Sequence, residues 1–444
     1  MKTFSDLNLN KQLLAALEDN GFSTPTTIQE RTFAPIMSGT DIIGIAQTGT
    51  GKTLAYLLPL LRMWKFSKSP YPTIMIIVPT RELVIQVVEQ IEMLTQNMNF
   101  EVAAAYGGAN IKRQIEDIQR GIDAVVGTPG RLYDLLLKGA IKANSIKKLV
   151  IDEVDEMLNL GFRIQVKHIL EFLPEKRQSL MFSATMTEDV EYFIENFFMG
   201  PQKIEAAPMG TPLENIEQSA YKVQNFNTKV NLLKHLLEDS DEFSKVLVFM
   251  STKKLADMVG VELEEKFENE FGVIHSNKSQ NLRFNVINNF KDGTFRFVLA
   301  TDVVARGIDV SEVSHVINFD CPDEPENYIH RIGRTGRADQ SGRAITFITP
   351  TDEENFLAIE VLMETEVPKQ ELPEEVEVSD VLIPDELPQV KMPNVQIKRS
   401  KIRDAGEAFH EKKAKNQKTN LSRRELMKKR LSKKKIKGRK KRKK

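Results

Sequence analysis

The sequence predicts an α/β fold with two units of similar plan, each a mostly parallel sheet covered by helices. Short apolar runs alternate with amphipathic stretches, such as residues 81–96, through most of the chain. This alternation favours a parallel sheet with helices on its faces. The apolar runs are continuous, which is typical of strands buried on both faces. The pattern pauses once, at residues 205–215 (EAAPMGTPLEN), where two prolines and a glycine indicate a linker.

Ten apolar runs are predicted to form strands, five before this pause and five after it. They are residues 41–46, 73–79, 123–127, 147–153, 178–185, 245–251, 271–275, 295–302, 314–320 and 343–349. The predicted units therefore cover residues 1–207 and 215–367, joined by a linker at residues 208–214. Beyond Val367 prolines and acidic residues dominate, so residues 368–397 are expected to form a solvated acidic linker.

The charge of the chain is distributed very unevenly. Residues 398–444 contain 23 Lys and Arg residues against 4 Asp and Glu residues, a net charge of +19. The whole chain has no net charge, so the remainder carries −19. Such asymmetry favours a polyanionic partner, usually nucleic acid or an anionic membrane surface. The alternative is a disordered tail that only improves solubility, a purpose for which runs of Lys and Arg are a poor choice.

Cysteine usage and hydropathy bear on the compartment. Cys321 is the single cysteine, so no disulfide can form within the chain, and no metal-ligand cluster surrounds it. The first residues, MKTFSDLNLN, lack the basic-then-apolar layout of a signal peptide. No apolar stretch is long enough to span a bilayer. These features predict a reduced, cytoplasmic protein without a membrane partner.

A phosphate-binding loop is the first motif that carries chemistry. Residues 46–53 read AQTGTGKT, directly after a predicted strand and opening a predicted helix. The backbone N–H groups of such a loop suit a phosphate. We expect Lys52 to reach the outer phosphates and the Thr53 hydroxyl to bind Mg²⁺. The strict pattern has glycine at position 46, where this chain has alanine. The predicted nucleotide contacts of the loop are Ala46, Gln47, Thr48, Gly49, Thr50, Gly51, Lys52 and Thr53.

An acidic cluster ends another predicted strand, in the sequence LVIDEVDEMLNLGF (residues 149–162). Carboxylates this close repel one another unless a cation lies nearby. Asp152 is expected to hold Mg²⁺ partly through water, because this ion keeps much of its hydration shell. Glu153 is expected to orient or deprotonate the attacking water. An exposed acidic turn is the alternative, and the phosphate loop makes it less favoured.

Three arginines recur at three-residue spacing in YIHRIGRTGR (residues 328–337). On a helix, Arg331, Arg334 and Arg337 would share one face. They could form a salt-bridged helix or contact RNA phosphates. A third interpretation is that they reach across a cleft to the γ-phosphate, as arginine fingers do in phosphate-loop enzymes.

Taken in order, these motifs resemble those of the DEAD-box RNA helicases, over nearly all of residues 1–365. GFSTPTTIQ (21–29) resembles the family's adenine-reading segment, with Gln29 as the reader and Phe22 and Phe4 beside it. PTREL, GG and TPGR resemble RNA-backbone contacts, and VFMST, QNLR and ATDVVARGID resemble the RNA and nucleotide motifs of the second domain. The RNA contacts that the resemblance implies are Pro79, Thr80, Arg81, Gly107, Gly108, Thr128, Pro129, Gly130, Arg131, Thr252, Thr301 and Gly307.

The same resemblance assigns the remaining roles. Ser183 and Thr185 of SAT would couple hydrolysis to unwinding, and Asp309 would lie near the ribose. Arg334 and Arg337 would contact the γ-phosphate, and His330 would link to the acidic motif, whose Asp155 is also counted among the catalytic residues. The resemblance also implies two tandem RecA-like domains, and alanine is the family's usual residue at position 46.

The acidic motif departs from the family signature, Asp-Glu-Ala-Asp, at one position. Here Val154 replaces the alanine, while every carboxylate is kept. In a tight core the added methyl groups cost roughly 1–3 kcal/mol unless neighbouring residues make room. We therefore expect a neutral variant with compensation nearby.

The predicted function is an ATP- and Mg²⁺-dependent RNA helicase with a monomeric core. No aromatic-rich base-reading module is evident, so we expect backbone recognition with little sequence specificity. The basic tail is expected to be disordered and to add nonspecific RNA affinity. Two other classes stay open: a DNA helicase or translocase with a related core, and a nucleotide-gated RNA clamp. The sequence names no RNA target, pathway or protein partner.

Overall fold

A computed structural model describes residues 3–47, 49–67, 69–206, 215–302, 313–336 and 341–387. The described residues belong to one compact body, residues 1–387. It contains two sheets, and we call the parts built on them the first unit and the second unit. The predicted linker at residues 208–214 and the basic tail at residues 398–444 lie outside the described residues.

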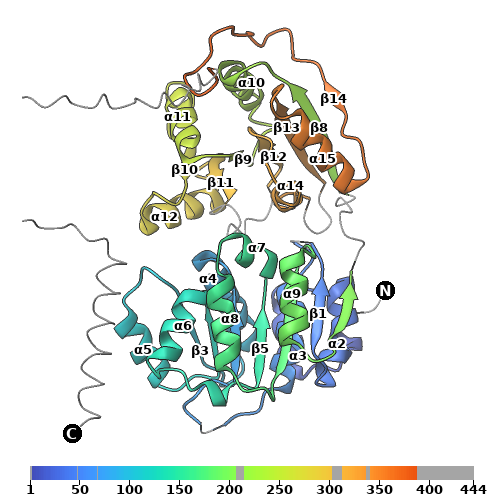
Figure 1. Ribbon diagram of the computed structural model, residues 1–444, viewed down its shortest axis with the longest axis vertical. Helices are drawn as coiled ribbons and strands as arrows, with labels where there is room; N and C mark the ends of the chain where they lie inside the picture. Colours follow the sequence, from blue (N-terminus) through green and yellow to red (C-terminus); the bar gives the residue numbers. More distant parts are fainter. Residues whose placement is uncertain are drawn as a thin grey trace, which may run out of the picture. The chain divides into compact units, whose positions relative to one another are not determined.

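The first sheet has seven parallel strands in the order β3-β4-β2-β5-β6-β1-β7 (Figure 1). Five of its strands lie within the five apolar runs before the pause, and β3 and β7 are additional. The strands are β1 Ile42–Ile45, β2 Ile74–Ile77, β3 Val102–Ala105, β4 Ala124–Gly127, β5 Lys148–Ile151, β6 Gln178–Ser183 and β7 Gln202–Glu205.

Two helical layers cover the two faces of this sheet. They comprise α1 Lys11–Asp19, α2 Thr27–Met37, α3 Lys52–Met63, α4 Arg81–Thr95, α5 Ile111–Gln119, α6 Pro129–Leu137, α7 Val154–Asn159, α8 Arg163–Phe172 and α9 Glu188–Phe197. Helices α1–α4 contribute to one apolar core and α5–α9 to the other. Strand residues divide between the cores by alternation: Ile74 and Ile76 enter the first, Met75 and Ile77 the second. This two-sided burial explains why the strands are apolar throughout.

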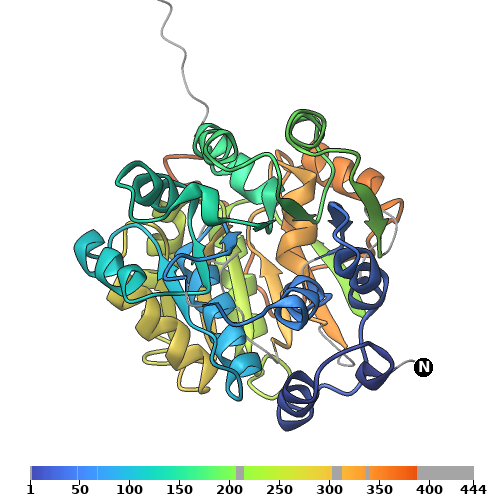
Figure 2. The same ribbon diagram turned by 90° about the horizontal axis from the view of Figure 1, so that it is seen from below.

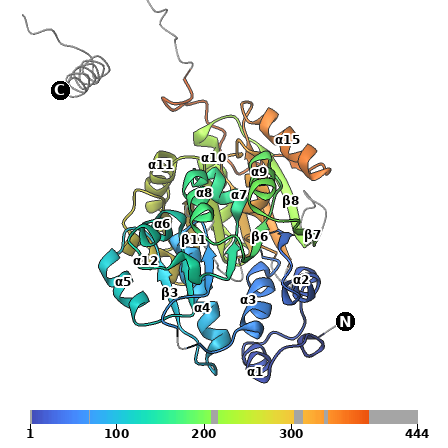
Figure 3. The ribbon, with the colours of Figure 1, turned by 60° about the horizontal axis from the view of Figure 1, so that its bottom comes forward.

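The N-terminal helices extend the first core. Helix α2 packs along α3, and α1 contacts α4. Figures 2 and 3 show these helices, in blue, together beside α3. Leu13 and Leu17 of α1 are fully buried, as is Ile28 of α2. The predicted adenine-reading segment is therefore attached to the same body as the phosphate loop.

The second sheet repeats the strand order of the first. Its order is β10-β11-β9-β12-β13-β8-β14, and all its pairs are parallel. The strands are β8 Ile216–Lys222, β9 Val246–Met250, β10 Phe271–Ile274, β11 Phe297–Thr301, β12 His315–Asn318, β13 Gly342–Ile348 and β14 Lys369–Gln370. The helices are α10 Phe226–Glu238, α11 Lys253–Glu264, α12 Gln280–Lys291, α14 Pro325–Ile332 and α15 Glu353–Met363.

The expectation of a solvated linker after Val367 is wrong for residues 368–387. Strand β14 adds to the edge of the second sheet. Residues 371–387, which we call the strap, then pack on α10, with Val376 buried in its core. Side-chain amides of Asn225, Asn227 and Asn231 donate to carbonyl groups of the strap. Composition favoured solvation, but widely spaced apolar residues and these hydrogen bonds hold the segment in place.

None of the helices in the described parts of the chain is long and apolar enough to cross a membrane.

Candidate active site

The phosphate-loop sequence lies between β1 and α3, the strand–loop–helix setting that its residues predicted. Gly51 has a left-handed backbone conformation, with φ of +84°, immediately before α3 begins. A Cβ atom on Gly51 would lie 2.3 Å from Nε2 of Gln29, so conformation and space both require glycine. The Thr50 hydroxyl donates to the carbonyl of Gln47 at 2.7 Å. Thr48 lies outside the described residues.

A pocket of about 560 Å³ opens over this loop, and Thr53 and Arg334 are among the residues that line it. Lys52 is 6% exposed, and no described residue gives its Nζ atom a hydrogen-bond partner. Burial raises the pKa values of Asp152 and Glu153, although the charge of Lys52 opposes this rise. The pocket therefore holds a buried cation without a hydrogen-bond partner opposite two carboxyl groups, an arrangement that suits a phosphate with a bound cation.

Glu153 occupies an unusual backbone position. It has φ of +50° and precedes α7 as the N-cap residue. Such a conformation is uncommon for residues other than glycine and is found at functional sites. It turns the chain sharply between β5 and α7, so that Asp152 and Glu153 both line the pocket.

Asp155 points away from the pocket and binds the SAT segment. Its Oδ2 atom accepts from the Ala184 and Thr185 backbone N–H groups at 3.1 and 2.8 Å, and from the Thr185 hydroxyl at 2.9 Å. The Ser183 hydroxyl donates to the Thr185 carbonyl at 2.7 Å. Burial alone would raise the pKa of Asp155, but His330, Lys52 and the Thr185 hydrogen bonds outweigh it and lower the pKa. Thr185 therefore meets the acidic motif directly, and Ser183 is joined to it through the Thr185 carbonyl.

The link between His330 and the acidic motif involves two carboxylates. His330 Nε2 lies 3.7 Å from Asp155 Oδ2, and Nδ1 lies 3.5 Å from Glu156 Oε1. All three side chains are buried. The sequence analysis missed Glu156, although an acid directly after the motif was a visible signal.

Arg331 and Arg334, the two described arginines of YIHRIGRTGR, do not share a helix face, which corrects the spacing argument for them. Helix α14 ends at Ile332, with Gly333 as its C-cap residue, so Arg334 lies beyond it. Arg334 lines the pocket, and its charge acts on Glu153. Arg331 turns instead into the interior of the second unit, where it binds Asp302. Arg337 lies outside the described residues.

Gln29 holds the adenine-reading segment against the phosphate loop. Its Nε2 group donates to the Gly51 carbonyl at 3.1 Å, and its Oε1 atom accepts from the Thr26 backbone N–H at 3.0 Å. The Thr26 hydroxyl donates to the Thr50 carbonyl at 2.8 Å. Phe22, 41% exposed, lines the pocket next to this segment, as does the buried Phe4.

The predicted RNA contacts of the first unit gather at the carboxyl ends of β2, β3 and β4. Thr80 and Thr128 are the N-cap residues of α4 and α6, and Pro79 and Pro129 adjoin them. Gly108 has φ of +80°, and a Cβ atom there would lie 2.4 Å from Nη1 of Arg81. The structure therefore packs the predicted Arg81, Gly107 and Gly108 together.

Arg131 lies on α6, next to Gly130 at its beginning. Its guanidinium donates to Gln114 Oε1 at 2.5 Å and to the Ala109 carbonyl at 3.1 Å. Both acceptors are neutral, so Arg131 keeps its positive charge uncompensated by these contacts. The charge suits a phosphate at this edge.

The second unit contributes Thr252 and Thr301 from the ends of β9 and β11. The Thr252 hydroxyl caps α11 by accepting from the Leu255 backbone N–H at 3.1 Å. Thr301 is the last residue of β11 and is buried. Gly307 and Asp309 lie outside the described residues.

A polar network that the sequence did not predict joins the two motifs PTREL and QNLR. Gln280 donates to Glu82 Oε1 at 3.1 Å and accepts from Arg81 Nη1 at 3.1 Å. Arg283 lies 3.3 Å from the same Glu82 oxygen. Residues about 200 positions apart in the sequence meet here, so no local pattern could have revealed the contact.

Val154 is fully buried in the core formed by α5–α9. It begins α7, between Glu153 and Asp155, and its side chain faces away from the pocket.

Tyr56, another residue that the sequence analysis missed, is fully buried beside Asp152. Burial, followed by the charge of Asp152, raises its pKa well above the usual value for tyrosine.

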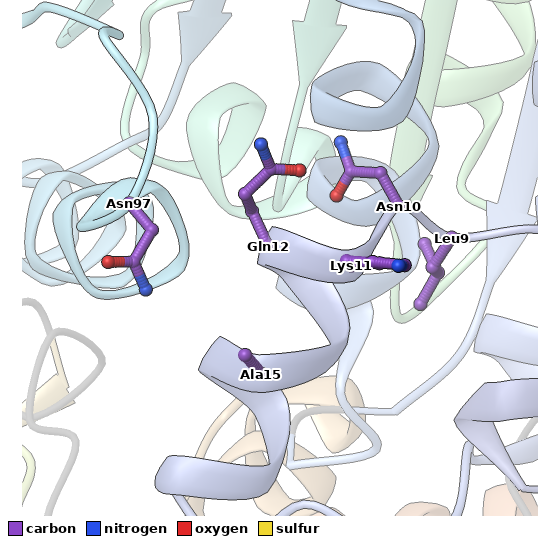
Figure 4. Close-up of a pocket in the computed structure, with 6 residues that line it drawn as sticks. All are labelled: Leu9, Asn10, Lys11, Gln12, Ala15 and Asn97. Atoms are coloured by element: carbon purple, nitrogen blue, oxygen red, sulfur yellow. The ribbon is translucent and has the colours of Figure 1, made fainter.

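Two further features concern ligands. Among the described residues no group of three or more His, Cys, Asp or Glu side chains is arranged to hold a metal ion. A shallow hollow at the start of α1 is bordered by Asn97 on the opposite side (Figure 4). The Asn10 side chain there caps α1, accepting from the Leu13 backbone N–H at 2.9 Å, and no charged residue other than Lys11 lines the hollow. We assign it no ligand.

Comparisons with known proteins agree along the chain. Residues 26–193 match the family DEAD/DEAH box helicase, and residues 228–339 match the helicase conserved C-terminal domain. The chain is 40% identical over 359 residues to DEAD-box ATP-dependent RNA helicase CshA of Bacillus subtilis (strain 168), covering 81% of this chain and 72% of that protein.

Two solved structures share the fold. One is S. cerevisiae Dbp5 bound to RNA and ADP BeF3, with 28% identity, a TM-score of 0.77, and coverage of 84% of this chain and 96% of that one. The other is the DEAD-box helicase Mss116 bound to ssRNA and UDP-BeF, with 26% identity, the same TM-score, and coverage of 84% and 81%. The predicted fold class, two tandem RecA-like domains, is confirmed.

Proposed function

Since the chain belongs to the DEAD-box ATP-dependent RNA helicases, we propose how its own residues carry out that activity. The observation that supports the proposal most strongly is Lys52. Its buried ammonium has no hydrogen-bond partner among the described residues, and it lies in a pocket with two carboxyl groups and Arg334. Binding a phosphate would give this ammonium charge-assisted hydrogen bonds without breaking any that it makes to the described residues, so binding is favourable.

In this proposal each pocket residue has one task. Lys52 and the loop N–H groups bind the outer phosphates of ATP. Glu153 takes a proton from, or orients, the attacking water, and its raised pKa brings it nearer to the range of a general base. Arg334 stabilises charge on the transferred phosphate. By resemblance alone, Arg337 would join Arg334, and Asp309 would hold the ribose.

Magnesium fits the oxygen groups that line this pocket. Thr53 and Asp152 would hold the ion, with water completing its shell. When bound, Mg²⁺ supplies neutralisation of phosphate charge.

Adenine recognition falls to the segment around Gln29. Its amide group already spans Thr26 and Gly51. The partly exposed ring of Phe22 offers a face on which a base can stack. Because Gln29 contacts the phosphate loop, base binding and phosphate binding would act on one connected element.

RNA is proposed to lie along the carboxyl-edge residues of both sheets. Thr80, Thr128 and Thr252 each begin a helix, and helix N-termini favour phosphate. Arg81 and Arg131 add positive charge. These groups suit phosphates, which carry no sequence information, so the contacts would be sequence-nonspecific and would support local strand separation.

Coupling between hydrolysis and RNA handling is assigned to the contacts of Asp155. Thr185 binds Asp155 directly, Ser183 at the end of β6 donates to the Thr185 carbonyl, and His330 approaches Asp155 from the second unit. Loss of the γ-phosphate would release Arg334 from the pocket and, with it, the neighbouring His330 contact. The core would act as a monomer in the cytoplasm, since all the named groups lie on one chain.

The activity is tested by comparing nucleic acids. We expect RNA to stimulate ATP hydrolysis and DNA of the same sequence to give little stimulation. We also expect ATP-dependent displacement of a short strand from an RNA duplex. Equal stimulation by DNA would favour a DNA helicase or translocase, and stimulation by RNA without strand displacement would favour a nucleotide-gated clamp.

The basic tail is proposed to hold RNA nonspecifically and to raise its effective concentration near the core. Each phosphate contact on single strands contributes a salt dependence of roughly 0.7 in the log–log slope. Cutting the chain after Ile397 should therefore weaken RNA binding and flatten its salt dependence, while ATP turnover at saturating RNA stays unchanged. The control replaces residues 398–444 with a Gly/Ser segment of equal length. Equal salt slopes for the cut and full chains would exclude this role.

A further inference from the structure

Arg331 is the arginine of YIHRIGRTGR that the proposed active site does not use. It is 2% exposed, although arginine is rarely buried. Its Nε and Nη2 groups donate to the two carboxylate oxygens of Asp302, at 2.6 and 2.8 Å. This is a bidentate pair, the strongest geometry that arginine forms with a carboxylate.

The same guanidinium reaches a second strand end. Its Nη1 group donates to the Asp320 carbonyl at 2.7 Å and to Asn318 Oδ1 at 3.3 Å. Its Cζ atom lies 5.2 Å from the centre of the Phe249 ring, on β9. One side chain of α14 therefore fastens that helix to the carboxyl ends of β11 and β12 and contacts β9.

The two ends of this connection belong to different parts of the proposed site. Asp302 directly follows Thr301, a proposed RNA contact at the end of β11. On α14, Arg331 directly follows His330, which contacts Asp155 and Glu156, and Arg334 lines the nucleotide pocket three residues later. The bidentate pair thus directly links the residue after a proposed RNA contact to the helix that leads to the nucleotide-facing groups of the second unit.

We propose that Arg331 is a positioning residue, paired with Asp302, that fixes the nucleotide-facing α14 to the RNA-facing end of β11. This inference rests on the proposed roles of Thr301, His330 and Arg334. RNA binding at Thr301 then favours the same placement of α14 that sets His330 and Arg334 against the first unit. Four guanidinium hydrogen bonds in a planar fork are needed, so lysine, with a single ammonium, cannot replace this arginine.

The test compares ATPase kinetics of the full chain with Asp302→Asn, Arg331→Lys and Arg331→Gln. Asp302→Asn keeps the shape of the side chain and removes its charge, so it serves even where Arg331→Gln folds poorly. In each variant we expect the RNA concentration for half-maximal ATPase to rise by roughly 2- to 30-fold, the range of such coupling contacts. Binding of an ATP analogue without RNA should stay within about twofold of the wild type, a distinction that general loss of structure would not give.

Arg296→Gln is the matched control. Arg296 is another largely buried arginine of the second sheet, bound to Glu270 and to the carbonyls of Phe243 and Leu237. It should lower the thermal midpoint as the test variants do, with unchanged RNA dependence.

If Arg331→Gln and Asp302→Asn shift only the thermal midpoint, like the control, Arg331 is merely structural. The double variant should be no worse than the worse single one, and additive losses would also overturn the pairing. A wild-type protein that RNA does not stimulate would instead refute the proposed function itself.

Discussion

The two sheets of this protein have the same strand order, yet a buried lysine and a nearby aspartate are arranged differently in the two units. In each unit the helix after the first strand carries a lysine, Lys52 on α3 and Lys229 on α10. In each, an aspartate follows the fourth strand of the sheet order: Asp152 after β5 and Asp320 after β12. Both lysines are about equally buried, 6% and 5% exposed.

In the second unit the lysine and the aspartate form an ion pair. Lys229 Nζ lies 3.0 Å from Asp320 and 3.7 Å from Asp352. The Ser251 backbone N–H also donates to Asp320, and although burial alone would raise the pKa of this aspartate, Lys229 and Ser251 lower it. In the first unit Lys52 has no hydrogen-bond partner among the described residues, and burial raises the pKa of Asp152.

The chain between the first strand and its helix accounts for this difference. In the first unit it is the glycine-containing loop, in which Gly49 and Gly51 have left-handed backbone conformations and line the pocket. In the second unit Asn225 caps α10 directly, accepting from the Thr228 backbone N–H at 3.0 Å. The same topology thus holds a pocket with a buried lysine in one unit and a closed ion pair in the other, so the local site rather than the fold distinguishes the two units.

Glu153→Gln should produce the largest effect. The carboxamide is nearly isosteric but cannot act as a base, so ATP turnover should fall by roughly 10²- to 10⁴-fold. ATP-dependent RNA binding should persist. Steady-state ATPase and RNA-binding assays measure the two properties, and turnover at the wild-type rate would show that Glu153 has been given the wrong role.

Lys229→Ala and Lys52→Ala test the comparison directly. Removing Lys229 leaves Asp320 buried without its partner, so the free energy of unfolding should fall by about 3–5 kcal/mol. Removing Lys52 breaks no hydrogen bond to a described residue, and Asp152 and Glu153, whose pKa values burial raises, can take up protons instead, so stability should fall less than in Lys229→Ala. Affinity for an ATP analogue should fall by at least about tenfold. Denaturant unfolding and nucleotide titration of both variants measure these properties. If Lys52→Ala lost more stability and Lys229→Ala lost more nucleotide affinity, the interpretation of the Lys52 pocket as an anion site would be contradicted.

Val154→Ala should have a smaller effect. Val154 is fully buried, so losing two methyl groups should lower the free energy of unfolding by roughly 1–3 kcal/mol. RNA-stimulated ATPase should survive, because the side chain points into the core and away from the pocket. A large gain in duplex displacement would instead reveal valine as a functional brake.

Asn231→Ala should give the smallest effect, on the strap. It removes the hydrogen bond from Asn231 to the Glu377 carbonyl, at 2.9 Å, and should lower the free energy of unfolding by about 0.5–1.5 kcal/mol. Asn288→Ala, at an exposed position of α12, is the control. Equal stability of the two variants, with unchanged hydrogen exchange in the strap, would mean that the amide contributes nothing to holding it.

Local patterns determined much of this protein. Continuous apolar runs predicted most strands of both sheets, because a strand buried on two faces has no room for polar residues. AQTGTGKT predicted a strand–loop–helix with Lys52 at the helix start, because glycines at this spacing before Lys-Thr are typical of a phosphate-binding loop. The acids at residues 152–155 were found for the same reason: the groups that make the site are neighbours in sequence.

Only the tertiary structure decided what depends on distant residues. Arg331 was expected on a face with Arg334, but α14 ends between them and Asp302 draws Arg331 inward. The strap looked solvated because its many acids outweigh Val376, whose partner core belongs to α10. Glu82 meets Gln280 from 198 positions away. Composition and spacing report on neighbours along the chain, whereas a buried ion pair or a packed segment depends on which surfaces the fold brings together.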